Sequence, residues 1–231
     1  MDDAGKVFES SPGSVVVPNP DLAPEYAYNM ELGLEKTFGS SVHVNVVGWY
    51  TLLTDAIVRR DFRFNGQDSI MYDGTLSQVQ ANVNAGEARV YGASASFLAD
   101  VNSMFSIASS VTWTHGRDVS EDVPLGHIPP VFGQTRLIYR RDRFRGEFAL
   151  HYNGWKHIRE YSPTGEDNET EATLHGTPAW LTLDLRASYQ LSELLQLNVG
   201  VENLLDEHYR PFSSGVSAAG RNLVLALRAT F

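Results

Sequence analysis

The sequence predicts an all-β fold of the antiparallel transmembrane β-barrel class, and three observations lead to this prediction. Segments in which apolar and polar side chains alternate recur along the 231 residues. The connections between these segments alternate between short turns and long polar loops. The last segment, 220–231, alternates without a break and ends on Phe231. Strands with one apolar and one polar face, joined by short turns at one end and long loops at the other, are typical of such barrels.

The strands are expected in pairs that read as hairpins. In the first strand, 24–38, Tyr26 and Met30 fall on one face and Glu31 falls on the other. A turn around Gly39 then leads into a second strand near 42–60. Seven further strands are expected near 77–99, 103–116, 131–141, 144–160, 178–190, 194–207 and 220–231. In these segments, too, the charged side chains share one face.

The connections fix the topology of the predicted barrel. Short turns are expected near 39–41, 100–102, 141–143 and 191–193. Long loops rich in Gly, Asp, Glu, Asn, Ser and Pro are expected near 61–76, 117–130, 161–177 and 208–219. The carboxy-terminus then lies on the side of the short turns, as in outer-membrane barrels. Residues 1–23, with three prolines, are expected to form a loop or a partial strand.

Composition limits the function classes. The formal charge of −10 argues against a nucleic-acid partner, which would need a basic face for the phosphates. The absence of cysteine excludes disulfide frameworks, zinc-thiolate sites and cysteine nucleophiles. No run of eighteen apolar residues occurs, so a transmembrane helix is not expected. The first residues lack the pattern of a signal peptide, so an exported protein is expected to have further sequence before Met1.

Several motifs, in one consistent order, resemble the carboxy-terminal barrel part of TonB-dependent receptors. Residues 19–35, NPDLAPEYAYNMELGLE, are similar to the family's passage from a loop into an alternating strand. Residues 124–130, PLGHIPP, are similar to its Pro-rich entry to a strand. Residues 201–209, VENLLDEHY, followed by Gly-Arg-Asn at 220–222 and a terminal Phe, are similar to its last two strands. The positions of Asn84, Ala88 and Gly92 also agree with the family pattern.

The resemblance implies transport across the cell outer membrane rather than catalysis. In this family a barrel of about 22 strands encloses an amino-terminal plug. Residues 24–231 would supply about nine carboxy-terminal strands of such a barrel, which is incomplete here. The plug is absent from this chain, so contact with TonB would run only through the missing plug. The expected partners are outer-membrane lipid, the missing amino-terminal barrel and plug, and a small-molecule or metal-chelate substrate.

The substrate implied by the resemblance is a scarce nutrient such as a ferric siderophore, cobalamin or an oligosaccharide. Arginine suits an anionic chelate through its planar set of donors, and Trp and Tyr stack on flat ligands. The candidate ligand contacts in and near the long loops are Arg63, Tyr72, Arg117, Trp155, Arg159, Tyr161 and Arg210. We expect no catalytic residues, metal site or cofactor, because no catalytic constellation or ordered ligand spacing is found.

The sequence is also compatible with two alternatives. A soluble or secreted all-β binding module would bury the apolar faces in a dry interior, whereas a barrel would turn them toward lipid. A passive porin would share the barrel but have no plug. Aromatic residues near strand ends would form girdles in a barrel and core packing in a soluble module; they are Tyr26, Tyr28, Trp113, Tyr139, Tyr152 and Tyr189.

Overall fold

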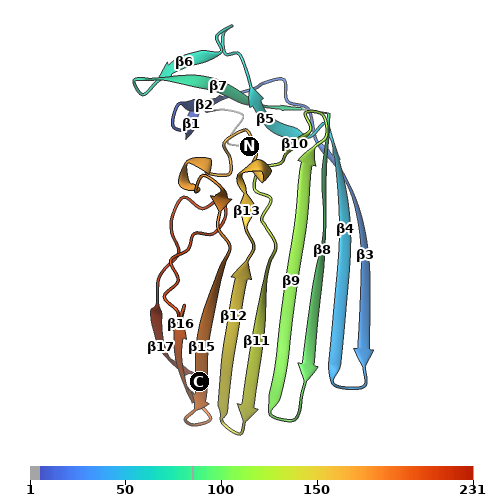
Figure 1. The fold of residues 1–231 in the computed structure, drawn as a ribbon, viewed down its shortest axis with the longest axis vertical. Coiled ribbons are helices and arrows are strands. Elements are labelled where there is room, and N and C mark those ends of the chain that lie inside the picture. The colour runs from blue at the N-terminus through green and yellow to red at the C-terminus, as the bar shows by residue number, and fades with distance from the viewer. Residues whose placement is uncertain (1–5, 85, 231) are drawn as a thin grey trace.

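The computed structural model describes residues 6–84 and 86–230, and its main feature is one large antiparallel sheet (Figure 1). Nine strands follow one another in the order β17, β16, β15, β12, β11, β9, β8, β4, β3, and the short β10 pairs with β9. These strands are β3 (Tyr26–Phe38), β4 (Val42–Thr54), β8 (Glu87–Asp100), β9 (Phe105–Asp118), β10 (Val123–Pro124), β11 (Phe132–Arg141), β12 (Phe144–Asn153), β15 (Trp180–Gln190), β16 (Leu195–Glu202) and β17 (Asn222–Ala229). The predicted all-β class, antiparallel arrangement and nine consecutive strands are confirmed.

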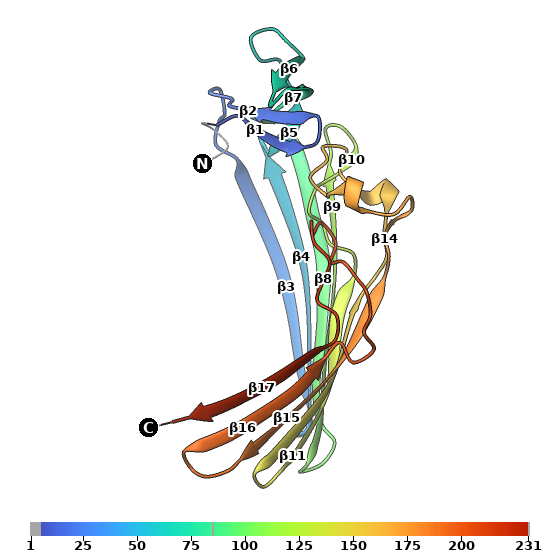
Figure 2. The same ribbon diagram turned by 90° about the vertical axis from the view of Figure 1, so that its left-hand side faces the viewer.

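The two ends of the sheet differ as the sequence predicts. The turns that join β3 to β4, β8 to β9, β11 to β12 and β15 to β16 are short and lie at one end (Figure 1). The long loops lie at the other end, which we call the outer rim. Figure 2 shows that the sheet is strongly bent, so that the two edge strands, β3 and β17, lie on the same side. The sheet therefore has the curvature of a barrel wall that is not closed by these strands alone.

Apolar and polar side chains occupy opposite faces of this wall. Leu185 and Leu225 are 50% and 77% exposed, whereas Asp184, next to Leu185 on β15, is only 6% exposed. The pairing between strands places apolar residues next to one another on the same face, because Leu185 lies opposite Phe148 and Val201 in the neighbouring strands. We call the face with Leu185 the membrane-facing face and the face with Asp184 the lumen face. A soluble module would need the reverse arrangement, so that alternative is excluded.

Two groups of aromatic rings on the membrane-facing face mark the height of the apolar band. Near the outer rim, the ring of Tyr91 lies 5.8 Å from that of Trp113. Near the short turns, the ring of Phe105 lies 4.9 Å from that of Tyr139. Phe105 and Trp113 are eight residues apart on β9, which corresponds to about 27 Å along a strand and about 20 Å of height at a typical tilt. This spacing fits aromatic girdles on either side of an apolar band of roughly 25 Å.

Two predicted strands are each divided in the structure, because the chain crosses there between the main sheet and a second one. The strand expected at 42–60 ends at Thr54, and β5 begins separately at Ile57. The strand expected at 77–99 is divided into β7 and β8, with Gly86 between them in a left-handed conformation at φ +57°. Asn84 holds the corner, because its Nδ2 donates to the carbonyl oxygen of Asp55 at 2.8 Å. The chain therefore turns where it leaves the membrane-spanning part.

The second sheet has five strands and lies at the outer rim (Figure 1). Its strands are β1 (Phe8–Ser11), β2 (Ser14–Val17), β5 (Ile57–Asp61), β6 (Ser69–Tyr72) and β7 (Thr75–Asn84). β2 runs parallel to β7, and its Val15 and Val17 form a small core with Val79 and Ala81. Residues 14–17 of the predicted loop or partial strand thus pair with a strand more than 60 residues away in the sequence, and residues 8–11 pair with residues 14–17. Residues 1–5 lie outside the described part of the chain.

The remaining elements belong to the outer loops. β12 ends at Asn153 and β16 at Glu202, several residues before the predicted ends at 160 and 207. The short elements beyond them are β13 (Lys156–His157), η2 (Ile158–Glu160), η3 (Glu169–Glu171) and β14 (Gly176–Thr177). Among residues 6–84 and 86–230, no helix has the length and apolar character needed to cross a membrane.

The assignment of faces predicts unequal effects of one substitution at two adjacent positions of β16. Val199 is on the membrane-facing face, and Asn198 lines a lumen-face cavity of about 310 Å³ together with Glu147. Val199→Arg should lower the free energy of unfolding by roughly 2 to 4 kcal/mol, because the charge would enter hydrocarbon. Asn198→Arg should cost much less. Denaturant titration of a barrel in which further strands complete this sheet, assembled in lipid vesicles, measures both, and equal losses would contradict the assignment.

Candidate functional site

The lumen face carries a cluster of ionic side chains near the outer rim. Asp184 accepts hydrogen bonds from Arg186 Nη2 at 3.1 Å and from the backbone N–H of Asn203 at 3.0 Å, and His151 Nε2 lies 3.4 Å from its carboxylate. Arg186 also donates to Glu202 Oε1 at 2.7 Å. The buried carboxylate of Asp184 is thus compensated by several partners, as a buried charge requires. We call His151, Asp184, Arg186 and Glu202 the lumen cluster.

An aromatic pair lies beside the lumen cluster. The ring of Trp180, at the start of β15, lies 4.2 Å from the ring of Tyr209, which comes from the loop after β16. Trp180 Nε1 is buried and has no acceptor among the described residues. Burial raises the pKa of the Tyr209 hydroxyl, and the carboxylates of the lumen cluster raise it further. The lumen cluster and this pair line a cavity of about 350 Å³.

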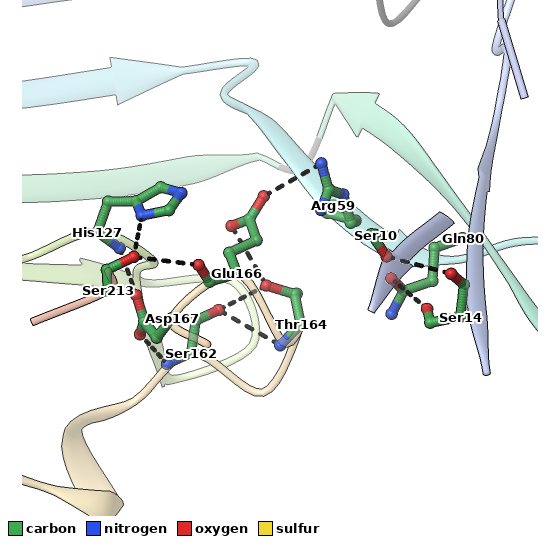
Figure 3. Close-up of polar contacts among 10 residues, drawn as sticks. All are labelled: Ser10, Ser14, Arg59, Gln80, His127, Ser162, Thr164, Glu166, Asp167 and Ser213. Atoms are coloured by element: carbon green, nitrogen blue, oxygen red, sulfur yellow. Dashed lines mark hydrogen bonds and ion pairs between the residues drawn. The ribbon is translucent and has the colours of Figure 1, made fainter. Parts of the chain in front are cut away.

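Above this cavity, three long loops meet at one buried aspartate. Asp167 accepts hydrogen bonds from the backbone N–H groups of His127 at 2.7 Å and of Ser162 at 2.8 Å (Figure 3). His127 Nδ1 lies 2.9 Å from the hydroxyl of Ser213, which belongs to the loop before β17. The next residue, Asn168, donates from Nδ2 to the carbonyl oxygen of Ser213 at 2.7 Å. We call His127, Ser162, Asp167, Asn168 and Ser213 the loop hub.

A buried lysine connects the same three loops. Lys156 is 6% exposed, and its Nζ donates to the carbonyl oxygen of Ile128 at 2.7 Å. Its ammonium group also lies 5.0 Å from the centre of the Phe212 ring, within the range of a cation–π interaction. Burial lowers the pKa of Lys156, and the nearby carboxylate of Asp167 opposes that shift. The loops at 125–128, 156–167 and 212–213 therefore pack as one body over the lumen face.

Two of the predicted ligand contacts lie in the second sheet and its loops. Arg63 Nε donates to Asp68 Oδ1 at 2.6 Å at an exposed position. The ring of Tyr72 packs against the small core of that sheet, and its hydroxyl is 3.5 Å from the carbonyl oxygen of Val7. Neither residue lines the cavity beside the lumen cluster. Both remain predictions, and Tyr72 has a structural role as well.

A third predicted contact, Arg117, faces away from the lumen. It shares the membrane-facing face of β9 with Trp113, and its Nε donates to Asp122 Oδ1 at 2.6 Å. Residues on that face point toward lipid or headgroups, so Arg117 lies outside the lumen-face cavity.

Trp155 and Arg159 are exposed on the loop between β12 and β15. Trp155 Nε1 donates to the carbonyl oxygen of His175 at 3.1 Å, and its ring stacks on His157 at 6.0 Å. Arg159 lies in η2, and its guanidinium has no hydrogen-bonding partner among the described residues. These two side chains are accessible to a ligand outside the barrel. Their role in ligand binding remains a prediction.

Tyr161 and Arg210 hold neighbouring loops together. The Tyr161 hydroxyl lies 2.5 Å from Thr177 Oγ1, and its ring meets that of Phe212 edge to face at 5.4 Å. Burial raises the pKa of Tyr161. Arg210 forms an ion pair with Glu171. The structure therefore brings Tyr161 and Arg210 to the same group of loops but does not gather all seven predicted residues into one site.

His151, Trp180 and Tyr209, which line the cavity beside the lumen cluster, are not among the contacts predicted from the sequence. His151 and Trp180 sit on the polar face of their strands, as the alternation alone would indicate. Tyr209 follows the motif at 201–209, but its approach to Trp180 depends on the path of a long loop. No group of three or more His, Cys, Asp or Glu side chains that could hold a metal ion occurs among the residues that the structure describes.

An apolar membrane-facing band, an ionic lumen face and one rim of long loops define the class of this chain as part of a transmembrane β-barrel of the outer-membrane type. The family described as TonB dependent receptor-like, beta-barrel matches residues 3–204. The chain belongs to this family. The family consists of transport receptors of the outer membrane, not of enzymes, and the outer membrane is where this chain resides.

Relatives agree with this assignment. The iron-regulated outer membrane virulence protein of Vibrio cholerae serotype O1 is 27% identical over 228 residues, which are 96% of this chain and 33% of that protein. The copper transporter OprC superposes with a TM-score of 0.76 at 17% identity, over 92% of this chain and 33% of that one. A ferric enterobactin receptor of Pseudomonas aeruginosa superposes with a TM-score of 0.69 at 17% identity, over 94% and 33%. The structural likenesses show the fold alone. The chain spans about a third of the length of these proteins.

The loop hub predicts a local loss of protection when Asp167 is changed. Asp167→Ala would leave the backbone N–H groups of His127 and Ser162 buried without an acceptor, at a cost of about 1 to 3 kcal/mol. Hydrogen exchange at these two amides should become on the order of 10 to 100 times faster. Asp122→Ala, at an exposed position, is the matched control and should leave both rates unchanged. Unchanged exchange in Asp167→Ala would show that the hub does not hold the loops.

Proposed function

We propose that this chain supplies the carboxy-terminal part of the barrel of a TonB-dependent receptor that takes up a metal chelate. The observation that carries the proposal is the cavity of about 350 Å³ between the lumen cluster and the Trp180–Tyr209 pair, beneath loops that pack as one body. Aromatic rings and ionic groups of both signs on one wall suit a ligand that is flat, polar and charged. A ferric siderophore fits these requirements better than cobalamin or an oligosaccharide. The names of the similar proteins support this choice, because they include an iron-regulated outer membrane protein, a copper transporter and a ferric enterobactin receptor.

In the proposed mechanism the outer loops and the upper lumen capture the substrate. Trp155 and Arg159 would meet it first at the outer rim, and Trp180 would bind it deeper. The indole N–H of Trp180 has no acceptor within the part of the chain that the structure describes, and a ligand oxygen would supply one. Passage inward would then require the plug to rearrange when TonB pulls on it. No covalent chemistry is involved.

The proposed domain organisation follows the resemblance. Residues 24–231 would be the carboxy-terminal part of the barrel, and the segment 1–23 would precede it, with its residues 8–11 and 14–17 in the second sheet at the outer rim. The plug and the amino-terminal barrel strands would complete the receptor, and TonB would act only through the plug. A passive porin is the competing proposal. The competing proposal would leave the lumen open and uptake independent of TonB.

The proposed function can be tested with a chimeric receptor. Residues 24–230 of this chain would replace the aligned barrel region of the Vibrio cholerae relative, which supplies the plug and the preceding strands. We expect uptake of radioactive iron from ferric enterobactin in cells that contain TonB and no uptake in cells that lack it. Cyanocobalamin serves as the control for substrate choice. Equal uptake with and without TonB would favour the porin, and uptake of cyanocobalamin instead of the iron chelate would reject the substrate class.

The role of Trp180 can be measured separately. Trp180→Phe keeps an aromatic ring but removes the donor, and it should weaken ferric enterobactin binding roughly 3- to 10-fold. Trp180→Ala should weaken it more, by an order of magnitude or more, because the ring contact is also lost. The matched control is Trp113→Phe, which changes an indole on the membrane-facing face and should not alter binding. Titration of the assembled chimera with the chelate decides between these outcomes, and wild-type affinity in Trp180→Ala would exclude Trp180 as a contact.

A further inference from the structure

The membrane-facing face of the main sheet carries charges only near the ends of its strands. The alternation of each strand and the pairing of its residues assign every position to one face. Across the nine strands, all described in full, the charged residues on this face are Lys36, Glu87, Arg89, Arg117 and Arg141. Lys36 and Arg141 lie toward the short turns. The other three lie at the outer rim.

The two arginines at the outer rim lie directly opposite each other. Arg89 of β8 pairs with Arg117 of β9 in the register of the sheet. Like charges in such positions are unfavourable unless an anion lies between or above them. Each guanidinium has one carboxylate partner, because Arg89 Nη2 lies 3.4 Å from Glu87 and Arg117 Nε lies 2.6 Å from Asp122. Both carboxylates are exposed, and such pairs are weak and exchange readily for a stronger anion.

The height of the arginine pair is fixed by the aromatic girdle below it. Arg89 and Arg117 are each two residues beyond Tyr91 and His115, or about 7 Å farther along the strands. The rings of Tyr91 and His115 are 5.1 Å apart, and both belong to the outer girdle with Trp113. Aromatic girdles lie at the depth of the membrane interface. The guanidinium groups therefore lie at the level of the headgroups of the outer leaflet.

We propose that Arg89 and Arg117 form a binding site for the phosphate group of a glycolipid in the outer leaflet. Two adjacent guanidinium groups present several N–H donors to one phosphate and would relieve their mutual repulsion by sharing it. The acyl chains of the same lipid would lie along the apolar band below, against the rings of Tyr91 and Trp113. The site is on the opposite face from the lumen cluster. It therefore depends on the membrane-facing assignment and not on the proposed substrate.

The proposal is tested by lipid binding to the assembled chimeric receptor described above, purified in detergent and measured by native mass spectrometry. The probe is lipid A that carries two phosphates, and the comparison is the same lipid with its phosphates removed. We expect the wild-type protein to bind the phosphorylated lipid at least tenfold more tightly. Equal affinity for the two lipids would overturn the proposal, and this comparison needs no variant.

Variants locate the binding to the arginine pair. The double change Arg89→Gln with Arg117→Gln should remove most of the preference for the phosphorylated lipid, and the double change to Lys should retain part of it because the charge remains. Arg141→Gln, which neutralises an exposed membrane-facing arginine at the opposite end, is the matched control and should bind as wild type does. Heat-modifiable gel mobility checks that each variant is assembled. A preference that survives in the double Gln variant, or is lost equally in Arg141→Gln, would reject this location.

Discussion

The structure depends on one constraint, which is that a backbone polar group in hydrocarbon must find its hydrogen-bonding partner within the protein. All nine consecutive strands of the main sheet meet it by antiparallel pairing with their neighbours. Only β3 and β17 have an open edge, and only further strands can satisfy those edges in lipid. The same pairing fixes the faces, since a slip of one residue would move Leu185 to the lumen face and Asp184 into lipid. The ionic lumen face is therefore a consequence of the register, which lets charged side chains lie at membrane depth without contact with hydrocarbon.

The constraint also explains which parts of the fold can be predicted from sequence. Within the membrane-spanning part, lipid enforces strict alternation, so the strands at 26–38, 105–118 and 222–229 start and end within a few residues of the prediction. Above the membrane this requirement ends. There the chain turns at Asp55 and Gly86, and local pattern no longer indicates where a strand will pair. Val15 is an example. It is buried because β2 pairs in parallel with β7, and no local pattern in the sequence predicts this pairing.

The candidate site, too, can be predicted where its residues lie on strands and cannot be predicted where they lie in loops. The faces of Asp184 and Arg186 follow from alternation, so the ionic character of the lumen wall is predictable. The loop residues are different, since the sequence cannot tell a side chain that is available to a ligand from one that is used within the loops. Tyr161 and Arg210 have the chemistry of ligand contacts, yet both hold loops together. The composition of a loop indicates what its side chains could bind, and only the tertiary contacts decide which of them remain accessible.

The loops themselves face a problem that the barrel wall does not. They are polar and rich in glycine, so they cannot build a hydrophobic core of useful size, and ordering them costs conformational entropy. The structure offsets this cost with buried polar groups that each serve several segments, above all Asp167 and Lys156. Asp167 joins its own loop to the loop at 125–128, and Lys156 joins that same pair of loops to the loop at 212–213, so the position of each of the three loops depends on the other two. Loops tied in this way lose less entropy when they close on a ligand, which favours affinity. The residues that bind no ligand thus contribute to binding by holding the exposed ones, Trp155 and Arg159, in place.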